Sequence, residues 1–286
     1  MYDYVCDFPA AITVTIVVLA QGMCGLSKCI TRYLIAMAVA DLLVILIDVI
    51  LLETLVLHLP YLPVFHTPVC RLHLVLYFII IESSVWLTVA FTFDRFIAIC
   101  CPQLKTKYCT ERTAGVVIWT ICAFSCVENI PVYFIYQPQL VINGQPWYCS
   151  VKPSFYVFPV WRAFAWLDII QTPLLPFIFI VLFNTLTIRQ VLVASSVRQG
   201  LRGVANGRDK EMESRKKSII LLFTISGTCL AVLLSLVITI SHSHTDTCCI
   251  RNLNRIYWNI IGIYIGILGS VVDCPPPMVW RERRGT

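Results

Sequence analysis

Long runs of apolar residues recur along nearly the whole chain, and this feature limits the possible folds more than any other. A helix needs about 20 mostly apolar residues to cross the roughly 30 Å core of a bilayer, because each residue advances it by about 1.5 Å. The sequence therefore predicts an all-α membrane protein with a bundle of seven transmembrane helices, in a single domain over residues 1–286. The predicted spans are residues 9–25, 31–57, 70–101, 113–134, 164–193, 216–241 and 256–275.

The composition agrees with a lipid environment. Hydrophobic residues make up 58% of the chain and charged residues only 13%, whereas soluble proteins average about 25% charged residues. The first and last apolar runs are the weakest. Because the first run is barely long enough and follows no basic segment, it fits neither a signal peptide nor a full span, and we expect a shortened first helix.

The basic residues predict the orientation of the bundle, since Lys and Arg near the ends of spans tend to stay in the cytoplasm. With the N-terminus outside, only five basic residues face the exterior, and the other 17 of the 22 face the cytoplasm. The polar and basic segment 195–217 is then the third cytoplasmic loop. The net charge of +6 needs no nucleic-acid partner. The five outer residues are Arg71, Lys152, Arg162, Arg251 and Arg255.

The fourteen cysteines divide by compartment. Cys70 opens the third apolar run and Cys149 lies in the second outer loop, so both are on the oxidising side. A disulfide between them is plausible and would tether that loop over the helix ends. Cys6, Cys248 and Cys249 are also predicted outside, and their pairing stays open. Several others lie in or beside apolar runs, where cysteine packs as a small hydrophobe: Cys100, Cys101, Cys122, Cys126 and Cys229.

The third apolar run carries the most specific motif. Its segment SSVWLTVAFTFDRFIAIC, from Ser83 to Cys100, resembles the inner half of the third helix of rhodopsin-like (class A) G-protein-coupled receptors. The acidic–Arg–aromatic signature of that family corresponds to Asp94-Arg95-Phe96. The family also places a cysteine at the outer end of this helix, and Cys70 precedes Arg95 by 25 residues, about 37 Å of helix.

Other segments extend the resemblance from about residue 24 to residue 196. The second run carries AVADLL around Asp41, and Trp119 and Pro176 match a fourth-helix tryptophan and a fifth-helix proline of the family. The segments at 24–29 and 182–184 look closest to the orphan receptors grouped with the aromatic-amino-acid-sensing ones. The resemblance implies a multi-pass receptor of the plasma membrane that binds an unknown extracellular small ligand or peptide and activates a heterotrimeric G protein. No enzymatic constellation of nucleophile and base, and no metal-ligand set, is evident.

The resemblance also suggests roles for residues at the inner end and in the middle of the bundle. Asp94, Arg95 and Phe96 are expected to couple to the G protein, with Arg95 paired to Asp94 at rest and released on activation; a plain snorkelling arginine is the alternative. The lipid bilayer and the G protein are the expected partners, and the only expected cofactor is an allosteric sodium ion. Its predicted pocket consists of Asp41, Ser84 and Ser270.

Four residues are candidates for a ligand pocket. Asp48 follows Asp41 by two helical turns and either lines the ligand cavity or bonds to a neighbouring helix. Tyr77 stands where amine receptors of the family carry an aspartate, which disfavours a monoamine ligand. Glu82 and Asp168 are expected to form a carboxylate pair that shares a proton or attracts a cationic group of a ligand.

The resemblance weakens toward the C-terminus. Residues 229–235 lack the tryptophan and proline of the family's sixth helix, residues 273–277 lack its Asn-Pro-x-x-Tyr motif, and Ile12 replaces a first-helix asparagine. These changes keep a second hypothesis open, a signalling-deficient or decoy receptor-like membrane protein. A transporter is the third hypothesis and is disfavoured because no internal repeat is detectable.

Overall fold

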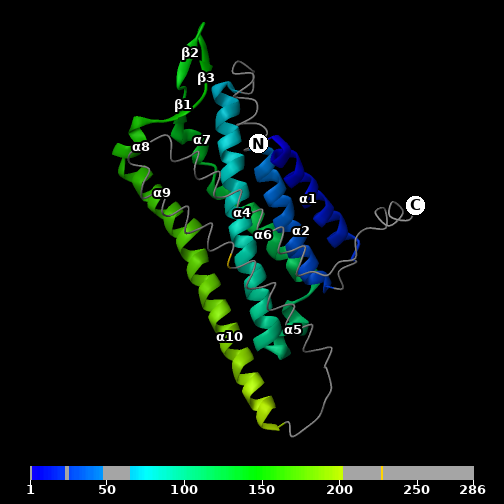
Figure 1. Cartoon of the computed structure of the whole chain (residues 1–286). Coiled ribbons are helices and arrows are strands. Elements are labelled where there is room, and N and C mark those ends of the chain that lie inside the picture. Colours follow the sequence, from blue (N-terminus) through cyan, green and yellow to red (C-terminus); the bar gives the residue numbers. More distant parts are fainter. Residues whose placement is uncertain (1, 23–25, 48–64, 202–226, 228–286) are drawn as a thin grey trace, which may run out of the picture.

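The computed structural model describes residues 2–22, 26–47, 65–201 and 227, and Figure 1 shows their arrangement. Within these residues, four helical segments are long and apolar enough to cross a membrane: Lys28–Ile47, Thr67–Cys100, Glu111–Ile135 and Pro159–Val193. They confirm the third to fifth predicted runs as helices and the second run as far as Ile47, since its remaining residues, 48–57, lie outside the described residues. The predicted spans 216–241 and 256–275 lie outside the described residues.

Helix α1 (Tyr2–Ala20) differs from the first predicted span at both ends. It ends five residues before the predicted boundary at residue 25, because Gly22 adopts a φ of +67° and its N–H bonds to the carbonyl of Leu19 at 3.1 Å. A left-handed glycine of this kind is a common way to end a helix. Helix α2 (Lys28–Val44) begins three residues before its predicted start, where the Ser27 hydroxyl accepts a bond from the Ile30 N–H.

Helix α4 (Thr67–Cys100) is the central element, and α2, α6 (Glu111–Glu128) and α10 (Leu175–Leu201) all contact it. In Figure 1, α1 and α2 lie on one side of α4 and the long α9–α10 rod on the other. Short helix α5 (Pro102–Tyr108) follows α4 at the end of the molecule opposite the hairpin. Its lysines, Lys105 and Lys107, are among the predicted cytoplasmic residues.

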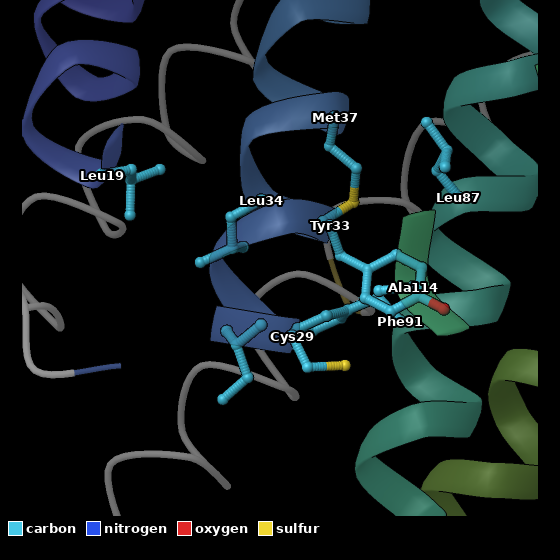
Figure 2. Packing of buried hydrophobic residues seen from close by; sticks show 9 residues of the cluster. Leu19, Cys29, Tyr33, Leu34, Met37, Leu87, Phe91 and Ala114 are labelled. Carbon is cyan, nitrogen blue, oxygen red and sulfur yellow. The ribbon is translucent and has the colours of Figure 1, made fainter. Parts of the chain in front are cut away.

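The core between α1, α2, α4 and α6 is apolar. Figure 2 shows Tyr33 and Met37 of α2 directed toward Leu87 and Phe91 of α4, with Leu19 of α1 and Ala114 of α6 also in the cluster. The rings of Tyr33 and Phe91 meet edge to face at 6.5 Å between centroids. On the other side of α4, Phe96 stacks on Phe183 of α10 at 5.6 Å. These contacts hold the helices on both sides of α4.

The segment after α6 forms the outer cap of the described bundle. It contains α7 (Val132–Ile135), β1 (Tyr136–Gln137), β2 (Leu140–Ile142), β3 (Gln145–Trp147), β4 (Ser150–Val151) and α8 (Pro153–Val157). Strands β2 and β3 pair antiparallel around Asn143 and Gly144, whose φ angles are 52° and 74°. Two positive φ angles in a two-residue loop are typical of a tight hairpin turn that favours Asn-Gly.

The fifth predicted span is a composite helix. It begins with α9 (Pro159–Ile169), passes through the π-helical turn η3 (Ile170–Leu174) and continues as α10. Helix α10 runs past the predicted end at residue 193 to Leu201, so the first residues of the predicted third cytoplasmic loop are helical. The rest of that loop lies outside the described residues.

Candidate functional site

At the inner end of α4, Asp94 and Arg95 form a buried ion pair. The Arg95 guanidinium donates from Nη2 to Asp94 Oδ2, and the two residues are only 7% and 6% exposed. The guanidinium also lies 5.9 Å from the centre of the Phe91 ring. Its Nε finds no hydrogen-bond partner among the described residues. Arg95 is therefore held within the bundle and not extended to the inner surface.

Two thiols hold Asp94 from neighbouring elements. Cys29 of α2 donates from Sγ to Asp94 Oδ1 at 3.2 Å, and Cys109, between α5 and α6, donates to the Asp94 main-chain oxygen at 3.6 Å. Burial first, and then the Asp94 carboxylate, raise the pKa of Cys109 to about 11. The thiol therefore stays protonated near neutral pH and remains a donor. No role was predicted for these two cysteines, because a spacing of 65 residues, as between Cys29 and Asp94, carries no local signal.

A surface ion pair lies at the same end of the molecule. Arg32 Nη2 of α2 contacts Glu111 Oε1 of α6 at 2.5 Å, and Lys28 Nζ lies 3.9 Å from the other carboxylate oxygen. These side chains are well exposed, so the pairs contribute little to stability. Phe96, the third residue of the signature, forms an aromatic cluster with Phe93 and Phe183. The signature residues therefore contact α2 and α10 as well as their own helix.

The structure brings together two of the three residues of the predicted sodium pocket. The Ser84 hydroxyl of α4 donates to Asp41 Oδ1 of α2 at 3.2 Å. Ser270 lies outside the described residues, as does Asp48. The Asp41–Ser84 contact places a carboxylate and a hydroxyl oxygen, both ligands that sodium accepts, at the interface of two helices.

Glu82 and Asp168 share no hydrogen bond among the described contacts, but the charge of Asp168 acts on Glu82, so the expected carboxylate pair stays a prediction. Asp168 accepts a hydrogen bond from Thr172, one turn along its own helical segment, at 3.4 Å. Glu82 instead accepts bonds from Asn129 Nδ2 and from Gln171 Nε2, the latter at 3.2 Å. The sequence missed these two partners because nothing in a single chain shows which faces of three helices meet.

The other pocket candidate, Tyr77, packs against α2. Its side chain lies against a buried cluster of Ala40, Val44 and Ile80, and its ring meets that of Phe78 at 6.0 Å between centroids. Tyr77 therefore stands on the side of α4 that faces α2. Within the described residues, no group of three or more His, Cys, Asp or Glu side chains is arranged to hold a metal ion.

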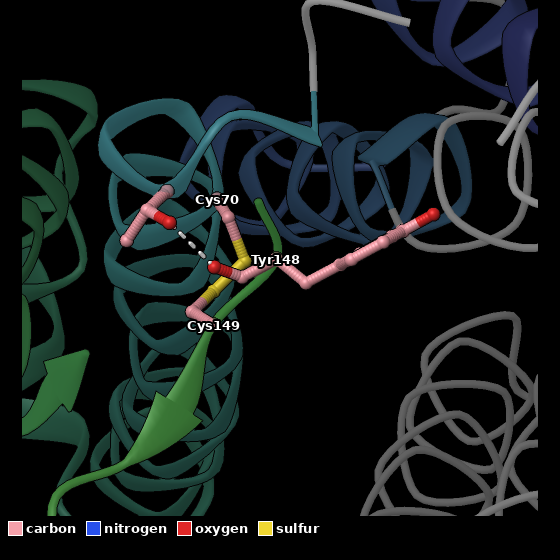
Figure 3. The surroundings of a disulfide bond; sticks show 4 residues. Cys70, Tyr148 and Cys149 are labelled. Carbon is pink, nitrogen blue, oxygen red and sulfur yellow. Dashed lines mark hydrogen bonds between the residues drawn. A yellow bond between two sulfur atoms is a disulfide. The ribbon is translucent and has the colours of Figure 1, made fainter. Parts of the chain in front are cut away.

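At the outer end of α4, a disulfide joins Cys70 to Cys149, as Figure 3 shows. The two Cα atoms are 6.2 Å apart, within the usual range for a disulfide. Beside it, the Thr67 hydroxyl donates to the Tyr148 carbonyl at 2.7 Å, and the Tyr148 N–H donates to the Phe65 carbonyl at 2.8 Å. The predicted disulfide is present, and two hydrogen bonds of Tyr148 beside it help to fix the outer loop to the start of α4.

A family comparison matches most of the chain. Residues 11–274 match the model of the 7 transmembrane receptor (rhodopsin family). The match covers the two predicted spans that lie outside the described residues, in addition to the four spans seen in the structure.

Proposed function

The chain belongs to the rhodopsin family of seven-transmembrane receptors, and from this premise we propose that it converts the binding of an extracellular ligand into nucleotide exchange on a heterotrimeric G protein. Members of this family are multi-pass membrane receptors and not enzymes. The proposal adds a small molecule or peptide as the ligand, the plasma membrane as the location and the G protein as the partner. We also propose that the chain is related to the orphan receptors grouped with the aromatic-amino-acid-sensing ones. This part of the proposal rests on the two short segments at 24–29 and 182–184.

The observation that carries the proposal is the buried Asp94–Arg95 pair. Arginine stays charged at any physiological pH, so a buried guanidinium needs a counter-charge. Here the preceding residue supplies that charge, and Cys29 and Cys109 hold it in place from α2 and the α5–α6 connection. A movement that separates these elements would free Arg95 to contact a cytoplasmic partner. The pair is therefore suited to be the resting half of a two-state switch.

The outer end supports the proposed direction of signalling. The disulfide joins the hairpin segment to the helix that carries Arg95 at its other end. A ligand bound beneath this segment would contact α4 directly, and α4 packs against α2, α6 and α10. We also propose that sodium binds at Asp41 and Ser84 and favours the resting state, because this pair links α2 to α4 between the two ends.

The test is a comparison of nucleotide exchange at matched surface amounts of tagged protein. Asp94→Asn removes the counter-charge, so we expect it to raise basal exchange about 5–150-fold, the range that a bias of 1–3 kcal/mol produces. Arg95→Ala, alone or added to Asp94→Asn, should reduce exchange to the background of cells without the receptor.

The matched control is Arg32→Ala, which removes an exposed arginine from the same end of the bundle. It should leave exchange in the Asp94→Asn background unchanged. The exchange assay is repeated with each class of heterotrimeric G protein. If Asp94→Asn reaches the surface but shows no exchange above Arg95→Ala with any of them, the proposed signalling function is wrong. The chain would then be a signalling-deficient member of the family.

A further inference from the structure

Polar side chains from three helical segments meet halfway along α4. Glu82 is 12 residues from Cys70 and 13 from Arg95, about 18 Å and 20 Å along the helix. It is 6% exposed and accepts hydrogen bonds from Asn129, which directly follows α6, and from Gln171 of η3. The same Gln171 nitrogen also contacts Glu128 Oε2 at the end of α6. We call Glu82, Glu128, Asn129 and Gln171 the central polar cluster.

This cluster brings two carboxyl groups to one amide nitrogen without a basic side chain. The three ion pairs among the described residues, Lys28–Glu111, Arg32–Glu111 and Arg95–Asp94, all lie at the inner end. Asn129 and Gln171 are neutral donors, so they orient the carboxyl oxygens but cannot balance their charge. Glu82 and Glu128 also hydrogen-bond to each other, which requires a proton on one of them, and the charge of Asp168 acts on Glu82 as well. When both glutamates are ionised, they repel each other and lose hydration. A cationic partner would relieve both costs.

A second observation points to a bound group at this position. Ser125 of α6 is 1% exposed, and its Oγ has no hydrogen-bond partner among the described residues. Ser125 lies one turn inward of Asn129 on the same face of α6, and Asn129 donates to its carbonyl at 2.9 Å. Buried polar atoms are normally satisfied, so the Ser125 oxygen, which can accept a hydrogen bond, indicates a further polar occupant.

We propose, resting on the receptor function inferred above, that the central polar cluster binds the protonated amine of an organic cation. Glu82 and Glu128 supply the counter-charge, Asn129 and Gln171 fix the carboxyl groups, and the Ser125 hydroxyl accepts a further hydrogen bond. An ammonium group has three hydrogen-bond donors and no acceptor, so it can donate to the oxygens of Glu82, Glu128 and Ser125.

The site is separate from the position where Tyr77 stands. Five residues along α4 correspond to about 500° of rotation, so Glu82 lies about 140° around the helix from Tyr77. Tyr77 packs toward α2, whereas Glu82 contacts α6 and η3. The tyrosine therefore disfavours an amine beside α2 but places no limit on an amine between α4, α6 and η3.

The test is ligand-induced thermal stabilisation of the purified full chain, which needs no G protein. The probe is phenethylamine, a primary amine that is protonated at neutral pH, and 2-phenylethanol is the neutral analogue of similar shape. Phenethylamine should raise the melting temperature in a saturable way, and 2-phenylethanol should not. Glu82→Gln and Glu128→Gln should each weaken the apparent affinity about thirtyfold or more, because each removes one charge from a desolvated pair.

Glu111→Gln is the matched control, since it changes a carboxylate at the inner end and should leave the amine effect intact. If Glu82→Gln cannot be purified, Glu128→Gln and Ser125→Ala carry the test. Any of three results would overturn the proposal: phenethylamine does not stabilise the wild-type chain, 2-phenylethanol stabilises it equally, or phenethylamine stabilises both glutamine variants as much as the wild-type chain. Stabilisation by acid alone that depends on Glu82 would also overturn it, with the proton as the occupant. Because G-protein exchange is measured separately, failure of either proposal can be recognised.

Discussion

Asp41 and Ser84 connect α2 to α4 by a single hydrogen bond at the level where both helices are closely packed. The serine donates to one carboxylate oxygen and satisfies only part of the carboxylate's capacity, which is about four acceptor sites. A carboxylate with remaining acceptor capacity beside a hydroxyl oxygen is a suitable pair of ligands for a small hard cation. If sodium binds at this pair, it should stabilise the protein, and this effect can be measured without knowledge of the ligand.

Sodium should stabilise the purified chain through Asp41. An ion that binds only the folded state raises stability by mass action, and a gain of about 1 kcal/mol raises the melting temperature of a chain of this size by about 2–4 °C. Sodium chloride should produce this rise and potassium chloride at equal ionic strength should not. Asp41→Asn should abolish it, and Ser84→Ala should weaken it. A rise that persists in Asp41→Asn, or that also disappears in the control Asp168→Asn, would contradict a site at Asp41.

Contacts between residues far apart in the chain could not be predicted from the sequence, whereas a local motif could. The motif at residues 94–96 could be recognised because its residues are adjacent in the chain. The Cys29–Asp94 and Asn129–Glu82 contacts join residues 65 and 47 positions apart. Which side chains meet across two helices depends on the rotation and depth of each helix. A single sequence fixes neither, so the contacts of Glu82 with Asn129, Gln171 and Glu128 were not predicted.

Among the elements, α4 connects the two ends of the bundle, because one continuous helix carries the disulfide, Glu82 and the Asp94–Arg95 pair. The π-helical turn η3 has a more local effect. It interrupts the regular helix between α9 and α10, contains Pro173, and presents Gln171 to both Glu82 and Glu128. Proline removes a main-chain donor, and single π turns inside helices often occur at functional sites. The apolar pattern predicted this span but not the turn within it.

The tether between α4 and the outer hairpin segment should be required for delivery to the cell surface. Cys70→Ser should lower surface delivery and destabilise the purified chain by about 2–5 kcal/mol, the usual effect of removing a native disulfide from a small extracellular domain. Cys149→Ser should have the same effect, and the double variant should be no worse than either single variant, since all three lack the same bond. Flow cytometry and thermal unfolding would measure both quantities.

The control for this comparison is Cys126→Ser, which replaces an exposed free cysteine on α6. It should leave both delivery and stability unchanged. Normal delivery of Cys70→Ser, or additive losses in the double variant, would contradict a structural role for the tether.

For the whole molecule, the sequence predicted the helices that long apolar runs determine, but it did not predict their caps. Ser27 and Thr110 accept main-chain bonds and begin α2 and α6 three and two residues before the predicted starts. The sequence also could not predict which face of each helix points inward. A helix that is apolar all round has no stripe to mark its buried side. Trp119 of α6 illustrates this limit. It matches a family position, yet it is 77% exposed and points away from the described bundle.

The orientation of the whole bundle can be tested with two cysteine substitutions at opposite ends of α4. Val141 in β2 and Leu104 in α5 are both exposed apolar residues outside the spanning segments, and they lie in the hairpin and in the connection after α4, respectively. The strong asymmetry of basic residues predicts that the hairpin is extracellular and α5 cytoplasmic. A membrane-impermeant maleimide should therefore label Val141→Cys in intact cells and Leu104→Cys only after permeabilisation. The unsubstituted chain sets the background from native cysteines, and the reverse labelling pattern would show that the N-terminus is inside.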